Sequence, residues 1–212
     1  MLRDEAISLI ALQLGNRTDL NATILTVLQH VQETILEGDA RNLPWFLLKE
    51  DSTTTVPTGA TRVALPTDFL LEEEDWCLAR ENADRSLTIL EKDDYDFLLN
   101  KWSTASGTVE AYSLNGDYFY LFPAMAADQV LHMRYLGRDA SLGTGNIQNN
   151  WLKYAADLLI AKTGEYIASR VLQNVELAAR FQNDAVQAAN RLYTLNEARQ
   201  HAGRNYIMGG DN

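Results

Sequence analysis

The stretch Thr108–Pro123, TVEAYSLNGDYFYLFP, predicts a β-hairpin in the middle of the 212-residue chain. Asn115-Gly116 suits a two-residue type I′ turn, because both central residues of that turn need positive φ. This turn sets the cross-strand pairs Ser113–Tyr118, Ala111–Tyr120 and Val109–Phe122. The other face receives Tyr112, Leu114, Phe119 and Leu121. Both faces are therefore apolar; we expect one to cover a helical core and the second to be available to a neighbouring molecule.

Further strands are expected on both sides of the hairpin. Pro123 ends its second strand, and Val130–Leu136 returns as a third with alternating apolar residues. Earlier strands are predicted at Arg62–Leu65, Trp76–Arg80 and Leu87–Leu90, followed by a short helix around Asp93–Asn100. All four prolines lie between Pro44 and Pro123, so the middle of the chain is punctuated and both ends can be helical.

The two ends carry helical periodicity. A helix is predicted over Arg3–Leu14 with Gly15 as its stop, and a second one from the cap residues Asn16–Asp19 to Gly38. From Trp151 to Arg199 the pattern is helical, in two pieces divided near Gly164. A seven-residue repeat there indicates close helix packing, either within one bundle or against another subunit. Its members are Val171, Ala178, Ala185 and Leu192, with Val175 and Ala189 between them.

These patterns predict an α+β fold: a helical bundle formed by the N- and C-terminal helices, with an inserted β-rich domain. The bundle takes residues 1–50 and 149–203, the β-rich domain takes 51–148, and 204–212 form a flexible C-terminal tail. Gly203 is the expected helix stop, and Asn205, Tyr206, Ile207 and Met208 have the composition of a short strand. Such a strand either folds back on its own bundle or adds to the sheet edge of a partner.

The charge is strongly acidic and unevenly spread. The net charge is −11, and Thr67–Asp96 alone holds eleven acidic and three basic side chains. A protein that grips nucleic acid through its phosphates has the opposite sign. A solvated acidic face is the plainer interpretation of this segment.

No constellation for catalysis stands out, and no cofactor or metal is expected. The three histidines, His30, His132 and His201, lie on separate elements without ligand spacing. Cys77 follows Glu72, Glu73, Glu74 and Asp75, which would raise the pKa of its thiol. The single cysteine favours an intracellular origin, and no apolar run approaches a membrane span.

Several motifs in a fixed order resemble a known family. They are NLPWFLL, LPTDF (Leu65–Phe69), the hairpin, proline and strand from Tyr112 to Leu136, and a helix opening with WLKYAADLL. Together, from about Leu2 to Asn212, they resemble the head-to-tail adaptor (connector, tail-tubular or gatekeeper-like) proteins of tailed bacteriophages. An unrecognised enzyme and a non-viral binding module with a helical bundle remain the alternatives.

The resemblance implies a structural virion protein of the neck between head and tail, present in the host cytoplasm during assembly. Such proteins form a ring of about twelve subunits with heterologous contacts. The ring docks under the portal protein, extends the DNA channel and carries tail or nozzle proteins, and genomic DNA passes through without specific binding. Two surfaces gain a role: Arg204–Met208 would bind the portal or a neighbouring subunit, and Glu72, Glu73, Glu74, Asp75, Asp93 and Asp94 would line the channel or its rim.

Overall fold

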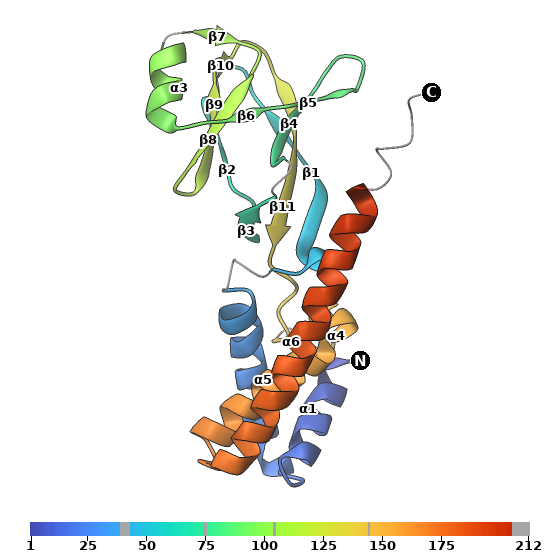
Figure 1. The fold of residues 1–212 in the computed structure, drawn as a ribbon. Helices are drawn as coiled ribbons and strands as arrows, with labels where there is room; N and C mark the ends of the chain where they lie inside the picture. The colour runs from blue at the N-terminus through green and yellow to red at the C-terminus, as the bar shows by residue number, and fades with distance from the viewer. Residues whose placement is uncertain (39–42, 74–75, 104, 144, 205–212) are drawn as a thin grey trace, which may run out of the picture. The chain divides into compact units, whose positions relative to one another are not determined.

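The computed structural model describes residues 1–38, 43–73, 76–103, 105–143 and 145–204 (Figure 1). It contains both helices and sheets, so the fold is mixed α+β. The chain divides into two compact units. The helical unit comprises Met1–Leu47 and the chain from Arg138 onward, and the sandwich unit comprises Leu48–Gly137.

The N-terminal part of the helical unit contains both helices that the sequence predicts. The first is α1 (Arg3–Gln13), and Gly15 follows it with a φ of +88°. The second is not uniform: a 3-10 turn η1 (Thr18–Leu20) leads into α2 (Asn21–His30) and then into a π-helix η2 (Val31–Leu36). Ile10 of α1 and Ile24 and Leu28 of α2 are fully buried, and both helices pack against α5.

Three helices form the C-terminal part: α4 (Asn150–Tyr154), α5 (Ala156–Arg170) and α6 (Val175–Arg204). The predicted division near Gly164 is wrong, because that glycine lies inside α5. The chain instead turns after α5, where Gln173 has a φ of +52° and the Asn174 side chain accepts a hydrogen bond from the Leu177 N–H, 3.0 Å away. An N-cap of this kind satisfies an amide that the first turn of a helix leaves free.

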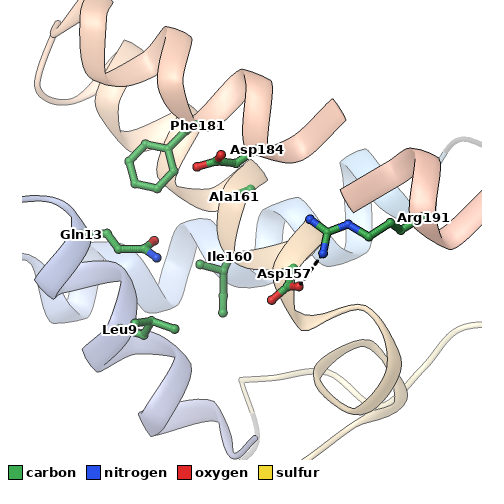
Figure 2. A pocket seen from close by; sticks show the side chains of 8 residues that line it. All are labelled: Leu9, Gln13, Asp157, Ile160, Ala161, Phe181, Asp184 and Arg191. Carbon is green, nitrogen blue, oxygen red and sulfur yellow. Dashed lines mark ion pairs between the residues drawn. The ribbon is translucent and has the colours of Figure 1, made fainter. Parts of the chain in front are cut away.

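Gly164 has a packing role. A Cβ at this position would lie 2.4 Å from Cε1 of Phe181, the buried aromatic residue of α6 (Figure 2). No real Cβ contact is that short, so only glycine permits this approach of α5 and α6. The glycine that looked in the sequence like a helix breaker is therefore a point of close contact between α5 and α6.

The inner face of α6 differs in part from the predicted repeat. Ala185 is buried, and Ala178 and Leu192 are half-buried, but their companions are Phe181 and Ala188. Val171 and Val175 are 44% and 80% exposed, and Ala189 is also exposed. Val175 and Ala189 belong to a second apolar row on α6, which we call the outward stripe. Its members are Val175, Ala179, Val186, Ala189 and Tyr193. The expected helix stop at Gly203 also shifts, because α6 continues through it to Arg204.

The sandwich unit is built from two sheets. Its strands are β1 (Leu48–Val56), β2 (Arg62–Ala64), β3 (Phe69–Glu72), β4 (Leu78–Glu81), β5 (Leu87–Ile89), β6 (Glu91–Lys92), β7 (Ser106–Gly107), β8 (Ala111–Asn115), β9 (Tyr118–Phe122), β10 (Ala124–Met125) and β11 (Gln129–Gly137). One sheet has the order β1-β11-β4-β5, with β3 also paired to β11, and the other has the order β2-β9-β8-β6. The short strands β7 and β10 pair with each other.

The predicted hairpin is present as β8 and β9, but its register is shifted. Asn115 pairs with Tyr118 and Ser113 with Tyr120, so the turn consists of Gly116 and Asp117. Gly116 has a φ of +58°, whereas Asn115 is not among the residues with positive φ. Positive φ, which glycine adopts freely, therefore occurs only at Gly116, the first central residue of the turn. This pattern is that of a type II′ turn.

The hairpin packs on both of its faces within the unit. Its inner face, with Tyr112, Phe119 and Leu121, meets Leu131 and Met133 of β11, so the hairpin covers a second sheet rather than the expected helical core. The outer face is covered by α3 (Tyr95–Trp102), whose Leu98 packs against Ala111 and Phe122. The second face is therefore partly covered within the unit, while Tyr118 and Tyr120 on it stay half-exposed.

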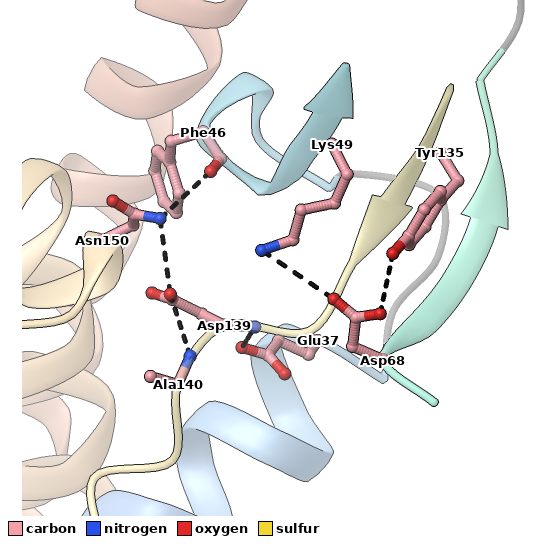
Figure 3. Close-up of polar contacts among 8 residues, drawn as sticks. All are labelled: Glu37, Phe46, Lys49, Asp68, Tyr135, Asp139, Ala140 and Asn150. Atoms are coloured by element: carbon pink, nitrogen blue, oxygen red, sulfur yellow. Dashed lines mark hydrogen bonds and ion pairs between the residues drawn. The ribbon is translucent and has the colours of Figure 1, made fainter. Parts of the chain in front are cut away.

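A buried polar network holds the segment that follows β11 to the helical unit. The Glu37 carboxyl is 2% exposed, and its Oε1 accepts hydrogen bonds from Trp151 Nε1 (2.8 Å) and Gln32 Nε2 (3.1 Å). It also accepts one from the backbone N–H of Asp139 at 3.3 Å (Figure 3). The Asn149 side chain donates to Gln32 Oε1 at 3.1 Å. Residues 138–148, which the sequence analysis placed in the β-rich domain, therefore belong to the helical unit.

The first testable consequence concerns Gly164. We expect Gly164→Ala to lower the free energy of unfolding by about 1–3 kcal/mol, because overpacking against Phe181 outweighs the gain of about 1 kcal/mol in helix propensity. Urea unfolding measures the change. The Gly164→Ala penalty should shrink in a Phe181→Leu background, where the ring is gone. An equal penalty in both backgrounds would show that the contact with Phe181 is not its cause.

The second concerns Glu37. Burial raises the pKa of its carboxyl, and the nearby Asp139 acts in the same direction. The unfolded chain therefore ionises Glu37 at lower pH than the folded protein, so stability falls as the pH rises from the ordinary carboxyl pKa to the raised one. Glu37→Gln keeps an acceptor for the three donors and removes the charge. We expect it to match the wild type near pH 4 and to exceed it near pH 7.

The control for that experiment is Glu37→Ala. It leaves the three donors without their acceptor and should be less stable than Glu37→Gln by about 1–3 kcal/mol at every pH, because neither variant titrates at this position. Thermal unfolding followed across the pH range distinguishes the two variants. A wild type whose stability, relative to Glu37→Gln, stays constant from pH 4 to pH 7 would contradict the account.

Candidate assembly surfaces

The LPTDF motif ties two strands of the sandwich unit together. Asp68 Oδ1 accepts a hydrogen bond from the Tyr135 hydroxyl at 2.8 Å, and its other oxygen lies 3.9 Å from Lys49 Nζ (Figure 3). The Phe69 ring stacks on Tyr135 with centroids 5.5 Å apart and meets Phe119 edge-on at 5.7 Å. Burial, assisted by Asp68, raises the pKa of Tyr135 to about 12, so the hydroxyl stays protonated as a donor. The motif has a structural role at the end of β11.

The acidic residues around β3 are held in local contacts. Glu72 accepts a hydrogen bond from the Tyr112 hydroxyl at 3.0 Å and forms an ion pair with Lys92. Glu73 lies 3.7 Å from Arg134 Nε. Both carboxylates are partly buried. Glu74 and Asp75, the other two members of the predicted acidic site here, lie outside the described residues.

Asp93 and Asp94 start the helix α3. The Asp94 carboxylate accepts hydrogen bonds from the backbone N–H groups of Asp96 (2.9 Å) and Phe97 (3.2 Å), and Asp93 Oδ1 accepts from Asp94 N at 2.8 Å. These contacts make Asp94 an N-cap, where a negative charge is also favoured by the helix dipole. Asp94 remains exposed to solvent, as does Asp96 beside it. The acidic segment therefore combines structural carboxylates with a solvent-facing negative surface.

The predicted portal-binding tail begins where α6 ends. Arg204 is the last residue of that helix, and Asn205, Tyr206, Ile207 and Met208 lie outside the described residues. Closer to its end, α6 is anchored to the turn η4 (Trp45–Leu47). Asn196 Oδ1 accepts from the Trp45 N–H at 2.9 Å, and the Arg199 guanidinium lies 4.3 Å from the centre of the Trp45 ring. Asn196, which breaks the apolar repeat in the sequence, thus has a structural partner.

The side chains most suited to catalysis, the Cys77 thiol and the histidines His30 and His132, are buried or in contact with neighbouring side chains. Burial, followed by the negative charge of Glu72, raises the pKa of the Cys77 thiol to about 12, so it is a poor nucleophile near neutrality. His30 packs against the ring of Tyr166, and His132 Nε2 lies 3.0 Å from Glu81 Oε2. Among the described residues, no group of three or more His, Cys, Asp or Glu side chains could hold a metal ion. Within the same residues, no helix has the length and apolar character to cross a membrane.

Some exposed apolar surface was not singled out from the sequence. On the sandwich unit, Leu87 and Ile89 of the edge strand β5 are 45% and 57% exposed, and Phe97 on α3 is 53% exposed. On the helical unit, the outward stripe of α6 is exposed along its length. The signal for the stripe was present in the sequence, because Val175 and Ala189 lie in the seven-residue repeat, but the repeat does not say which side of the helix faces inward.

Comparison with known proteins gives one clear match. The family model described as SU10 adaptor protein matches residues 1–207. No curated protein matches the chain. The family match spans nearly the whole chain and both structural units, and it confirms the resemblance that LPTDF and the hairpin suggested. The chain therefore belongs to the SU10 adaptor protein family, a family of phage head-to-tail adaptors.

Proposed function

We propose that this chain is the subunit of an adaptor ring that docks under the portal, extends the DNA channel and offers a platform to tail or nozzle proteins. The match of residues 1–207 to an adaptor family carries the proposal. Membership of that family implies a place in the virion neck and association with portal and tail proteins. The ring of about twelve copies is the finer part of the proposal, with heterologous contacts between neighbours. Assembly from the host cytoplasm completes it.

A structural rather than catalytic role is supported by what the described residues offer. Cys77 has a raised thiol pKa, and the partly buried acids Glu72 and Glu73 are used in ion pairs. By contrast, exposed apolar side chains lie on both units. Surfaces of this kind favour protein–protein contacts over chemistry.

We further propose that Arg204, Asn205, Tyr206, Ile207 and Met208 bind the portal or a neighbouring subunit. The family match continues to residue 207, past the end of α6, so it covers this segment up to Ile207. The helix α6 has 30 residues, a length of about 45 Å, so its C-terminal end lies far from Phe181 near its start. In this role Arg204 supplies an ion pair and Tyr206 an apolar anchor, with the segment adding to a sheet edge of the partner.

The acidic residues Glu72, Glu73, Glu74, Asp75, Asp93 and Asp94 are proposed to face the channel or its rim. A negative wall repels phosphates, so that genomic DNA passes without binding. The exposure of Asp94 supports this role, and the ion pairs of Glu72 and Glu73 reduce the charge that those two residues contribute.

The tail is tested by deleting residues 205–212. All described elements end by Arg204, so we expect this truncated chain to unfold at an unchanged temperature and to lose attachment to portal-bearing heads. The matched control removes only residues 209–212, which keeps Asn205–Met208, and should still attach. If the longer truncation lowers the unfolding temperature and leaves attachment intact, the segment belongs to the subunit's own core.

The ring is tested by measuring its mass with and without portal. We expect a monomer or weak association for the purified protein, because the charge of −11 per chain opposes closure of a ring. Portal-bearing heads should instead capture several copies, countable by native mass spectrometry. A ring that is stable in moderate salt without portal would show that the portal is not needed as a template for ring assembly. Heads that capture no protein at all would overturn the proposed function.

A further inference from the structure

The outward stripe of α6 is an exposed apolar row on one side of a long helix. Val175, Val186 and Tyr193 are 80%, 53% and 56% exposed, and Ala179 and Ala189 lie in the same row. These residues recur at intervals of four, seven, three and four, which keeps them on one side of an α-helix. The buried side of α6, which includes Phe181 and Ala185, packs against α5. The stripe is therefore a second apolar side of α6, exposed to solvent among the residues that the structure describes.

Two hollows open on another side of the helical unit. The first, of about 190 Å³, is lined by Leu9 and Gln13 of α1, Ile160 and Ala161 of α5, and Phe181 and Asp184 of α6 (Figure 2). The second, of about 310 Å³, is lined mainly by Tyr154, Leu158, Ala188, Leu192 and Leu195. Asp157 and Arg191 line both, and their ion pair, 3.7 Å long, lies where the two hollows meet. The first hollow has a mixed polar and apolar lining and the second is more apolar, and the Asp157–Arg191 ion pair separates them.

The stripe and the hollows lie on opposite flanks of α6. Nine residues make two and a half turns of an α-helix, so side chains nine apart point in opposite directions. Val175 is nine residues before Asp184, which lines the first hollow. Val186 is nine residues before Leu195, which lines the second. A projecting surface on one flank and a recessed surface on the other let identical subunits associate in one direction, the heterologous arrangement that closes a ring.

The charge at the C-terminal end of the stripe is opposite to the net charge of the second hollow. On the stripe, the Tyr193 hydroxyl is hydrogen-bonded to Glu197, and that contact raises the pKa of Tyr193. The second hollow is lined by the basic residues Lys153 and Arg191 and by Asp157, which pairs with Arg191, so its net charge is positive. A copy whose stripe entered the hollows of the next copy would bring Glu197 toward these two basic residues. Such complementarity favours the stripe-to-hollow contact over a stripe-to-stripe contact, in which two Glu197 carboxylates would approach each other.

We propose that neighbouring copies of this chain associate by packing the outward stripe of α6 in one copy into the two hollows beside α6 in the next. Val186 and Tyr193 provide the apolar contact, and Glu197 faces Lys153 and Arg191 of the neighbour. This inference takes from the proposed function the assembly of copies side by side. It adds the two surfaces through which neighbouring copies make contact.

Cysteine cross-linking tests the contact in the assembled state. Cys77, the only cysteine, is buried and is replaced by alanine. Val186→Cys and Leu195→Cys are then introduced together, because they place one thiol on the stripe and one in the second hollow. The protein is bound to portal-bearing heads and treated with a short bis-maleimide. We expect a ladder of covalent species larger than a dimer from the double variant, and no intermolecular product from either single variant.

Three results would overturn the inference. A dimer formed by Val186→Cys alone would mean that stripe meets stripe. Attached protein without a ladder would mean that another occupant covers the stripe, and would leave the adaptor function intact. An equal ladder from the control pair Asn183→Cys and Leu195→Cys would mean that cross-linking does not depend on the stripe, because Asn183 is exposed on α6 outside that row.

A second measurement uses the protein without heads. Val186→Asp places a charge at an exposed position of the stripe, so it should fold, and it should weaken the self-association seen by sedimentation equilibrium at high protein concentration at least tenfold. Asn183→Asp adds the same charge off the stripe and should have little effect. Equal losses from both variants would contradict the proposal. If the wild type is not captured by heads and also does not self-associate, both this inference and the proposed function are overturned.

Discussion

The sandwich unit depends on the need of β11 to satisfy its backbone hydrogen bonds on both edges. One edge pairs with β1 over most of its length, and the other pairs first with β4 and then with β3. Because the strand is central, Leu131, Met133 and Tyr135 are all nearly buried and form one wall of the core. The LPTDF motif then closes the far end of this strand, where Asp68 receives the Tyr135 hydroxyl. Removing β11 would leave three strands, β1, β3 and β4, without their common partner.

In the helical unit α5 has the comparable position, since α1, α2, α4 and α6 all contact it. At Gly164 the lack of a side chain on α5 leaves room for the Phe181 ring of α6. The Glu37 network adds a polar contact at the other side of the unit, where it joins the end of the π-helix η2 to Trp151 of α4. A buried carboxyl costs desolvation free energy, so its retention points to specificity of arrangement rather than to stability.

The sequence was most informative where a periodic pattern also has one buried side. The faces of the β8–β9 hairpin were predicted correctly although its register was not, because the pairing moved by two residues and only an odd shift exchanges the faces. Strand β1 was missed: its Ser52–Thr55 run has no apolar alternation, and its order comes from pairing with β11. The boundary near Arg138 was missed for a similar reason, since Asp139 and Asn149 meet Glu37 and Gln32 more than a hundred residues away. The two sides of α6 could not be told apart because both carry small and apolar residues at helical spacing.

The placement of the single cysteine has a consequence for particle durability. Cys77 is 1% exposed, and its thiolate is disfavoured at any pH a phage meets outside a cell. Disulfide exchange requires an accessible thiolate, so a particle that waits in aerated water without a cellular reductant does not accumulate mixed disulfides through this chain. An exposed thiol in its place would add an oxidisable group to the surface of the chain, where it could form disulfides with other proteins. Burying the sulfur under the sandwich sheets removes that form of ageing without removing the residue.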